Sequence, residues 1–173
     1  VLSLFFAQSS SSDSTVDPMT ERYDLLVLQG WMCLDADPEQ ARSKFEEAFK
    51  IQRTSEIFNL LASAYDRLGD PEKAIEYYQL AINLIESNHE NDKGQMLLLY
   101  ECKAEMAWVR SDYQLIIDNY KKALGYANKS QTKGINALIP IYESLLSQQR
   151  KREALKTSGL SADDLSKIRE MMN

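Results

Sequence analysis

Apolar and polar residues alternate with the period of an α-helix along most of the chain, most regularly between Ser55 and Ile85. In the first part of this stretch, apolar residues recur three and four positions apart, which places them on one face of a helix. They are Phe58, Leu61, Ala62, Tyr65 and Leu68. The second part repeats the pattern with Ala74, Tyr78, Ala81, Ile82 and Ile85. The pattern predicts two amphipathic helices, each with one buried face.

A tight turn is predicted between these two helices at Gly69, Asp70 and Pro71. Glycine adopts the left-handed conformation that ends many helices, and aspartate accepts hydrogen bonds from the first amides of the next helix. Proline suits the first helical position, where no N–H is needed. Asp-Pro pairs also occur at 17–18 and 37–38, where the same rule predicts helix starts. The recurrence is an independent sign of a repeated unit.

Residues 55–85 resemble the tetratricopeptide repeat (TPR), a helix–turn–helix unit of about 34 residues. The family places a large residue, a leucine, a small residue and a tyrosine in its first helix, and an alanine, an aromatic residue and an alanine in its second. Those places are held here by Phe58, Leu61, Ala62, Tyr65, Ala74, Tyr78 and Ala81. The second-helix places recur earlier at Ala41, Phe45 and Ala48, and later at Ile116, Tyr120 and Ala123. The resemblance therefore implies several stacked hairpins.

The expected fold class is all-α, an α-solenoid of about four TPR-like helical hairpins plus a C-terminal capping helix. The hairpins are expected over about residues 18–52, 55–85, 95–127 and 132–157. In the first of them, Gln29 or Gly30 takes the place of the family's small residue. About eight residues are inserted before the third, and we expect them to lengthen the flanking helices.

Two features are expected near the C-terminal end of this solenoid. Pro140 falls within the first helix of the fourth hairpin, where a proline kinks the backbone. Leu165, Ile168 and Met172 lie on one face of a final helix, and we expect this helix to cap the open end of the last hairpin.

Residues 1–16 differ from the rest of the chain, because an apolar octet, VLSLFFAQ, is followed by a Ser-rich linker. Three interpretations of residues 1–8 stay open: the remnant of a secretory signal peptide, a fused segment, or a segment that folds back onto the helical body. The sequence thus divides into residues 1–16 and a TPR-like helical domain over residues 17–173.

Composition narrows the function classes. The chain has 173 residues, 44% of them apolar, and a formal net charge of −6, which argues against a nucleic-acid surface. No apolar run approaches the length of a transmembrane helix. Cys33 and Cys102 lie among apolar residues in predicted helices and are expected to be buried free thiols. Free thiols favour the cytoplasm, whereas a signal-peptide remnant at residues 1–8 would indicate export, for example to a periplasm.

No catalytic set, metal site or cofactor motif is found in the sequence. His89 is the single histidine and stands in a polar loop, so neither a nucleophile–histidine pair nor a multi-histidine metal site is supported. No glycine-rich phosphate loop is present. We therefore expect a protein that is not an enzyme, with no cofactor.

The remaining candidate is a protein-binding surface. The resemblance implies that the first helices of the hairpins line a concave groove. Its expected residues are Asn59, Ser63, Asp66 and Arg67, then Glu101, Glu105 and Trp108, then Lys133 and Asn136. Tyr23, Leu26 and Leu34 are expected to form an apolar end of this groove. Glutamates suit a basic partner, and a tryptophan supplies an apolar contact, so a basic or amphipathic segment is expected.

One TPR subset clamps the C-terminal tails of heat-shock chaperones with lysine, asparagine and arginine side chains. At about those places this chain carries Leu26, Gly30, Leu60, Leu98 and Cys102, so such tails are disfavoured. The expected function is a non-enzymatic adaptor or scaffold that binds a peptide or helix of a partner protein. Two alternatives stay open: a structural subunit that assembles through its ends or convex face, and a regulatory TPR domain of a larger protein. The oligomeric state is left open.

Overall fold

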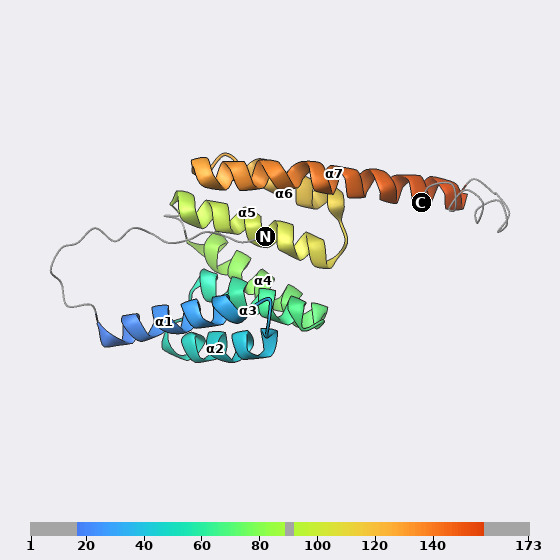
Figure 1. Cartoon of the computed structure of the whole chain (residues 1–173). Coiled ribbons are helices and arrows are strands. Elements are labelled where there is room, and N and C mark those ends of the chain that lie inside the picture. The colour runs from blue at the N-terminus through green and yellow to red at the C-terminus, as the bar shows by residue number, and fades with distance from the viewer. Residues whose placement is uncertain (1–16, 89–91, 158–173) are drawn as a thin grey trace.

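The computed structural model describes residues 17–88 and 92–157, and over these ranges the chain consists of seven α-helices (Figure 1). They are α1 (Pro18–Cys33), α2 (Pro38–Ile51), α3 (Ser55–Arg67), α4 (Pro71–Ser87), α5 (Lys93–Val109), α6 (Tyr113–Ala123) and α7 (Lys129–Thr157). Each helix packs against the next, so three hairpins stack along one direction and α7 follows them. The all-α solenoid expected from the sequence is confirmed.

Several sequence-based expectations lie outside the described residues. These are the fate of the octet and Ser-rich linker in residues 1–16, the surroundings of His89, and the capping helix within residues 158–173. None of the described helices is long and apolar enough to cross a membrane.

The predicted Asp-Pro helix starts are confirmed. The Asp37 carboxylate accepts a hydrogen bond from the backbone N–H of Gln40 at 3.0 Å, and Asp70 accepts one from Lys73 at 3.1 Å. Such caps satisfy amides that have no partner within the helix. Asp17 precedes Pro18 in the same way, but its side chain makes no capping hydrogen bond.

The turns after α3 and α5 share one geometry. Gly69 has φ of 75°, and its N–H donates to the carbonyl of Asp66 at 3.0 Å. Ser111 takes the same place after α5, with φ of 56° and an N–H bond to Trp108 at 2.8 Å. The left-handed region costs nothing for glycine but is strained for serine.

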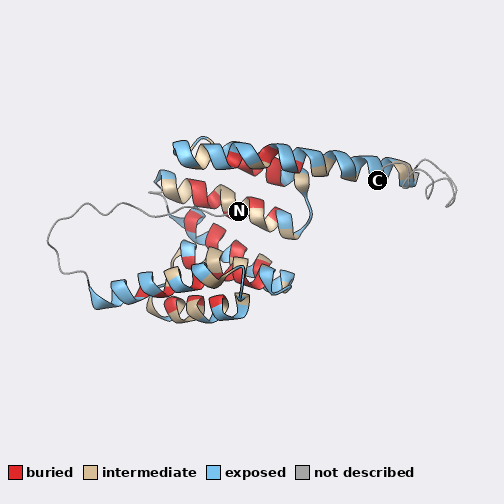
Figure 2. Cartoon of the chain, viewed as in Figure 1, coloured by how far each residue is buried: buried red, intermediate tan, exposed pale blue. Residues whose placement is uncertain are grey.

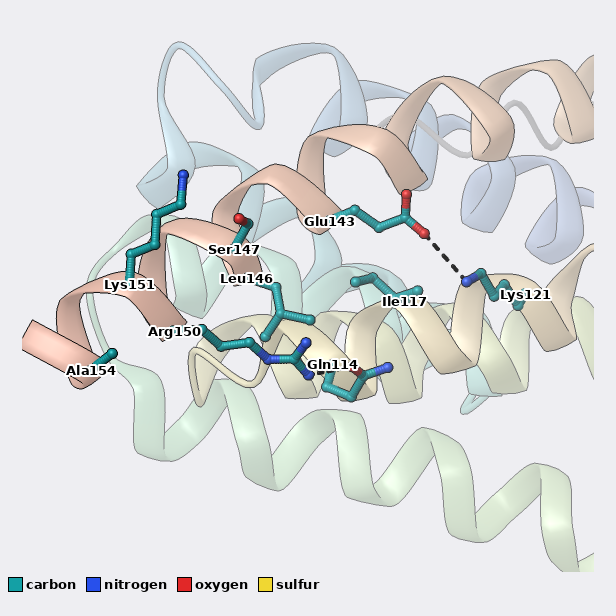
Figure 3. A pocket seen from close by; sticks show the side chains of 9 residues that line it. All are labelled: Gln114, Ile117, Lys121, Glu143, Leu146, Ser147, Arg150, Lys151 and Ala154. Atoms are coloured by element: carbon teal, nitrogen blue, oxygen red, sulfur yellow. Dashed lines mark hydrogen bonds and ion pairs between the residues drawn. The ribbon is translucent and has the colours of Figure 1, made fainter. Parts of the chain in front are cut away.

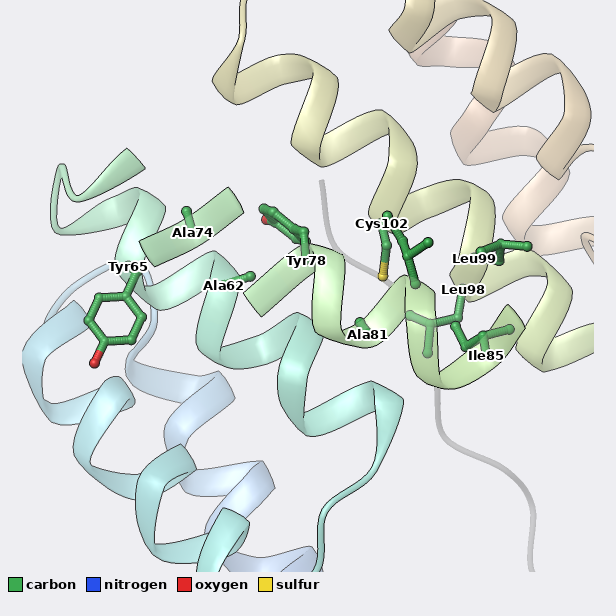
Figure 4. Packing of buried hydrophobic residues seen from close by; sticks show 10 residues of the cluster. Ala62, Tyr65, Ala74, Tyr78, Ala81, Ile85, Leu98, Leu99 and Cys102 are labelled. Atoms are coloured by element: carbon green, nitrogen blue, oxygen red, sulfur yellow. The ribbon is translucent and has the colours of Figure 1, made fainter. Parts of the chain in front are cut away.

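Small residues let the helices approach closely in the core. Ala62 of α3 and Ala81 of α4 are fully buried, and Figure 4 shows them in the cluster that also holds Ile85 and Tyr78. Cys102 of α5 completes this cluster as a buried free thiol, as expected. An alanine face allows two helix backbones to pack at short distance, so each hairpin nests against the next.

Gly30 is the small residue of the first hairpin. A Cβ atom added there would lie only 2.5 Å from Cε1 of Phe45, a residue that is fully buried in α2. Met32, two positions on, is 73% exposed. The structure thus selects Gly30 over Gln29 as the close-packing position between α1 and α2.

The inserted residues lengthen α4 and α5 as expected, because each has 17 residues against 14 in α2 and 13 in α3. The fourth hairpin, expected over about 132–157, is instead one continuous helix, α7, which runs through Pro140. Residues 145–156 contain neither glycine nor proline, so nothing in the local sequence ends the helix.

Replacing Gly30 with alanine is expected to lower the free energy of unfolding by about 1–2 kcal/mol, because overpacking against the Phe45 ring outweighs the gain in helix propensity. Gly134 of α7 is the matched control, since a Cβ there meets no atom within 4 Å. Gly134→Ala should raise the free energy of unfolding by about 0.5–1 kcal/mol. Urea denaturation of both variants measures the difference, and equal effects would contradict the close contact.

Glycine at position 111 and serine at position 69, made as separate variants, should change the free energy of unfolding in opposite directions. Ser111→Gly is expected to stabilise the protein by about 0.5–1 kcal/mol, because glycine relieves the left-handed strain. Gly69→Ser should destabilise it by a similar amount. Thermal unfolding followed by circular dichroism tests both, and a stabilising Gly69→Ser would contradict the equivalence of the two turns.

Candidate protein-binding surface

Helices α3 and α5 belong to neighbouring hairpins, yet side chains join them directly. The Ser55 hydroxyl donates to Oε1 of Gln95 at 3.2 Å. The Cys102 thiol donates to Oδ1 of Asn59 at 3.3 Å. These contacts hold the first helices of two successive hairpins together and create a continuous polar surface across them. We call this region the α3/α5 surface, and its residues are Asn59, Ser63, Asp66, Glu101 and Glu105.

Two tyrosines of the second helices, Tyr78 and Tyr120, extend their hydroxyl groups from the core to this surface. The Tyr120 hydroxyl donates to Oε1 of Glu105 at 2.9 Å, and the hydroxyls of Tyr78 and Ser63 lie 3.3 Å apart. Both pairs are separated by 15 positions in the chain, so they are equivalent contacts in successive hairpins. The rings are buried in the core, and only the phenol oxygens contribute to the surface.

Carboxylates give the α3/α5 surface an acidic character. Burial raises the pKa of Glu105, and the hydrogen bond from Tyr120 opposes the shift. Burial also raises the pKa of Asp66, against the opposing charge of Arg67. Burial and then the charge of Glu105 raise the pKa of the Tyr78 phenol. These groups therefore share one poorly solvated site, in which a positive charge from outside would be favoured.

The structure brings together most residues predicted for the first two groove helices. Asn59, Ser63, Asp66, Glu101 and Glu105 are all half-buried and lie on the α3/α5 surface. Arg67 is arranged differently, because its side chain is 42% exposed and pairs with Asp35 at 3.0 Å. Lys133 and Asn136 are exposed on α7, and among the described residues no hydrogen bond or ion pair joins them to this surface.

Trp108 borders the surface within a group of aromatic rings. It is 41% exposed, and its ring centroid lies 6.4 Å from that of Tyr113 and 6.1 Å from that of Tyr142. Tyr142 in turn stacks on Tyr120 at 5.8 Å. One edge of the indole is thus fixed by packing while the rest stays available. Sequence reasoning missed the tyrosines, although the spacing of 15 from Glu105 to Tyr120 was visible.

The apolar end of the groove is corrected by the structure. Tyr23 and Leu26 are each only 6% exposed, since they pack in the core formed with α2 and α3. The Tyr23 hydroxyl is 2.8 Å from Oγ1 of Thr54. Leu34 is half-buried against the same core. Leu25 and Met32 are exposed on the opposite face of α1, and Figure 2 shows exposed residues along much of this helix.

Over residues 17–88 and 92–157, no group of histidine, cysteine, aspartate and glutamate is arranged to hold a metal ion. A hollow is present, but it lies between α6 and α7 and is lined by residues other than those of the α3/α5 surface.

Helical hairpins that nest through alanines and present a polar surface on their first helices define this chain as a helical-repeat protein. The family model of the tetratricopeptide repeat matches residues 55–88, the span of α3 and α4. Residues 55–88 therefore form a tetratricopeptide repeat. Repeats of this family generally mediate protein–protein interactions and are typically found in non-enzymatic scaffolds. The comparison with curated proteins found no match.

The raised pKa of Glu105 predicts a specific pH dependence of stability. Between the ordinary glutamate pKa of 4.5 and the raised value, the folded state holds a proton that the unfolded state has lost. Stability therefore falls as pH rises through this window. Glu105→Gln does not titrate, so its free energy of unfolding should decline less with rising pH. Urea unfolding between about pH 4 and pH 8 measures this, and parallel curves would contradict the raised pKa of Glu105.

Proposed function

We propose that the α3/α5 surface binds a basic segment of a partner protein, so that the chain acts as an adaptor. The observation that carries this proposal is the grouping of Asp66 and Glu105 around the Tyr78 phenol, where burial raises the pKa of both carboxyls. A lysine or arginine side chain of the partner would replace water and favour the ionised carboxylates. Such an interaction is strong because it lies in a poorly solvated site.

Asn59 and Ser63 give this surface a way to orient an extended segment. Oδ1 of Asn59 accepts the hydrogen bond from the Cys102 thiol. The side-chain NH₂ group takes no part in this bond, so it can donate to a peptide carbonyl of the partner. The Ser63 hydroxyl donates to the carbonyl of Asn59 at 3.0 Å and fixes the same turn of α3. Backbone recognition through Asn59 would leave sequence preference to the carboxylates.

Trp108 lies three positions after Glu105 on α5, so both side chains project from the same side of the helix. Its exposed indole edge offers an apolar contact next to the acidic site. A partner segment with a basic residue and a nearby apolar residue would satisfy both, which favours an amphipathic segment. Exposed Lys133 and Asn136 on α7 would contact the segment only if it extends beyond α5.

Heat-shock chaperone tails remain disfavoured as partners, because their terminal carboxylate would meet the carboxylates of the α3/α5 surface. The buried free thiol of Cys102 and the half-buried Cys33 support the cytoplasm as the compartment. A regulatory domain of a larger protein would use the same surface. A structural subunit would use other surfaces, which the described ends of the solenoid provide.

Selection from a random linear-peptide library is expected to enrich peptides with lysine or arginine beside an apolar residue. Their affinity, measured by fluorescence anisotropy, should fall at least about tenfold in Asp66→Asn/Glu105→Gln and at high salt. Glu72→Gln/Glu76→Gln on α4 is the matched control, since it removes two exposed carboxylates from another helix. Enrichment of acidic peptides, or equal loss in both double variants, would contradict the proposal.

A further inference from the structure

A hollow of about 520 Å³ lies between α6 and α7, at the end of the described solenoid (Figure 3). Ile117 and Leu146 supply its apolar floor, and Ile117 is only 2% exposed. Lys121, Arg150 and Lys151 contribute cations around it. The hollow therefore combines an apolar base with a basic rim, which suits an apolar ridge flanked by acidic residues.

The pairing of α6 with α7 explains why this hollow is open. Lys121 pairs with Glu143 at 3.3 Å, and Gln114 accepts a hydrogen bond from Arg150 at 3.2 Å. This antiparallel register brings the start of α6 opposite residue 151 of α7. Because α7 continues to Thr157, its last turns extend past α6. The hollow lies along the part of α7 where its cover by α6 comes to an end.

A complementary ridge lies at the other end of the described solenoid. Leu25 and Met32 of α1 are 53% and 73% exposed, and Leu28 between them is partly exposed. Spacings of three and four place these three side chains on one face of the helix. Glu21 and Asp24 flank the ridge, are exposed, and form no ion pair with any described residue.

The ridge on α1 and the hollow between α6 and α7 match in length and in charge. At about 1.5 Å per residue, the ridge from Leu25 to Met32 is about 10 Å long, and the α7 lining from Glu143 to Ala154 spans about 16 Å. Helix α7 carries six Lys and Arg residues against two glutamates, a net charge of +4. Residues 17–128 carry 12 Lys and Arg against 20 Asp and Glu, a net charge of −8.

We propose that copies of this chain associate end to end, with the Leu25–Leu28–Met32 ridge of one copy docked in the α6/α7 hollow of the next. The contact joins two different surfaces, so it is heterologous and generates open chains of copies. It buries one helix face, which places it among small, weak interfaces of less than about 1,200 Å². This inference uses none of the residues of the α3/α5 surface and does not rest on the proposed adaptor function.

Sedimentation velocity of the full chain tests the association. The weight-average sedimentation coefficient is expected to rise between about 10 µM and about 500 µM protein, and to fall again in high salt, because opposite charges flank the contact. A coefficient that stays at the monomer value at every concentration overturns the proposal.

Two double variants, each lacking one of the two contact surfaces, give the decisive test. Leu25→Glu/Met32→Glu removes the ridge and keeps the hollow, whereas Arg150→Glu/Lys151→Glu does the opposite. Each variant is expected to be monomeric alone, with an apparent dissociation constant raised at least about tenfold. Their mixture should form a one-to-one dimer and nothing larger, because only one intact pair of surfaces remains. Variants that still associate alone, or a mixture that stays monomeric, would overturn the contact.

Matched controls separate these effects from misfolding. Leu80→Glu/Leu84→Glu places glutamates on the exposed face of α4, and Lys129→Glu/Lys133→Glu reverses two charges at the other end of α7. Both should associate like the wild type and retain its helical circular dichroism. Loss of association in either control would show that general charge, rather than the ridge and hollow, governs it, and would overturn the proposal. Peptide binding to the α3/α5 surface should be unchanged in Leu25→Glu/Met32→Glu, Arg150→Glu/Lys151→Glu and Leu80→Glu/Leu84→Glu, which change no residue predicted for that surface.

Discussion

Close contact between helix backbones is the interaction on which the rest of this structure depends. Ala62 and Ala81 are fully buried where α3 and α4 meet, and Gly30 lies directly against the Phe45 ring between α1 and α2. Larger side chains there would separate the helices, because a packed core leaves no space for them. The spacing also sets how far α5 lies from α3. The hydrogen bond from the Cys102 thiol to Asn59 exists only at that spacing.

The same packing places the chemistry of the α3/α5 surface. Tyr120 fills the core with its ring while its hydroxyl reaches Glu105. The position of the polar group is thus fixed by apolar contacts, as a preorganised binding surface requires. Burial that raises the pKa of Glu105 and Asp66 opposes stability at neutral pH, because both carboxylates lose hydration. The proposed binding role gives a physical reason for such a cost.

The proposed binding surface and the proposed assembly surfaces lie on different helices. The first is built on α3 and α5, whereas the ridge belongs to α1 and the hollow to α6 and α7. Their charges also differ, since α7 is basic within an otherwise acidic chain. A solenoid separates such functions readily, because each hairpin contacts only its neighbours and the ends have none. End-to-end contact would therefore leave the surface in the middle of each copy accessible to a partner.

Local sequence determined where the helices begin, which residues form the turns and which faces are apolar, because caps and helical periodicity act over a few residues. The local sequence also accounts for the unbroken course of α7, since residues 145–156 include no glycine or proline that would end a helix. Tertiary structure decided how each helix is rotated against its neighbours. One position turns a helix by about 100°, so Leu26 is buried while Leu25 is exposed. The contact of Tyr120 with Glu105, and the hollow between α6 and α7, likewise depend on packing between segments that no local pattern describes.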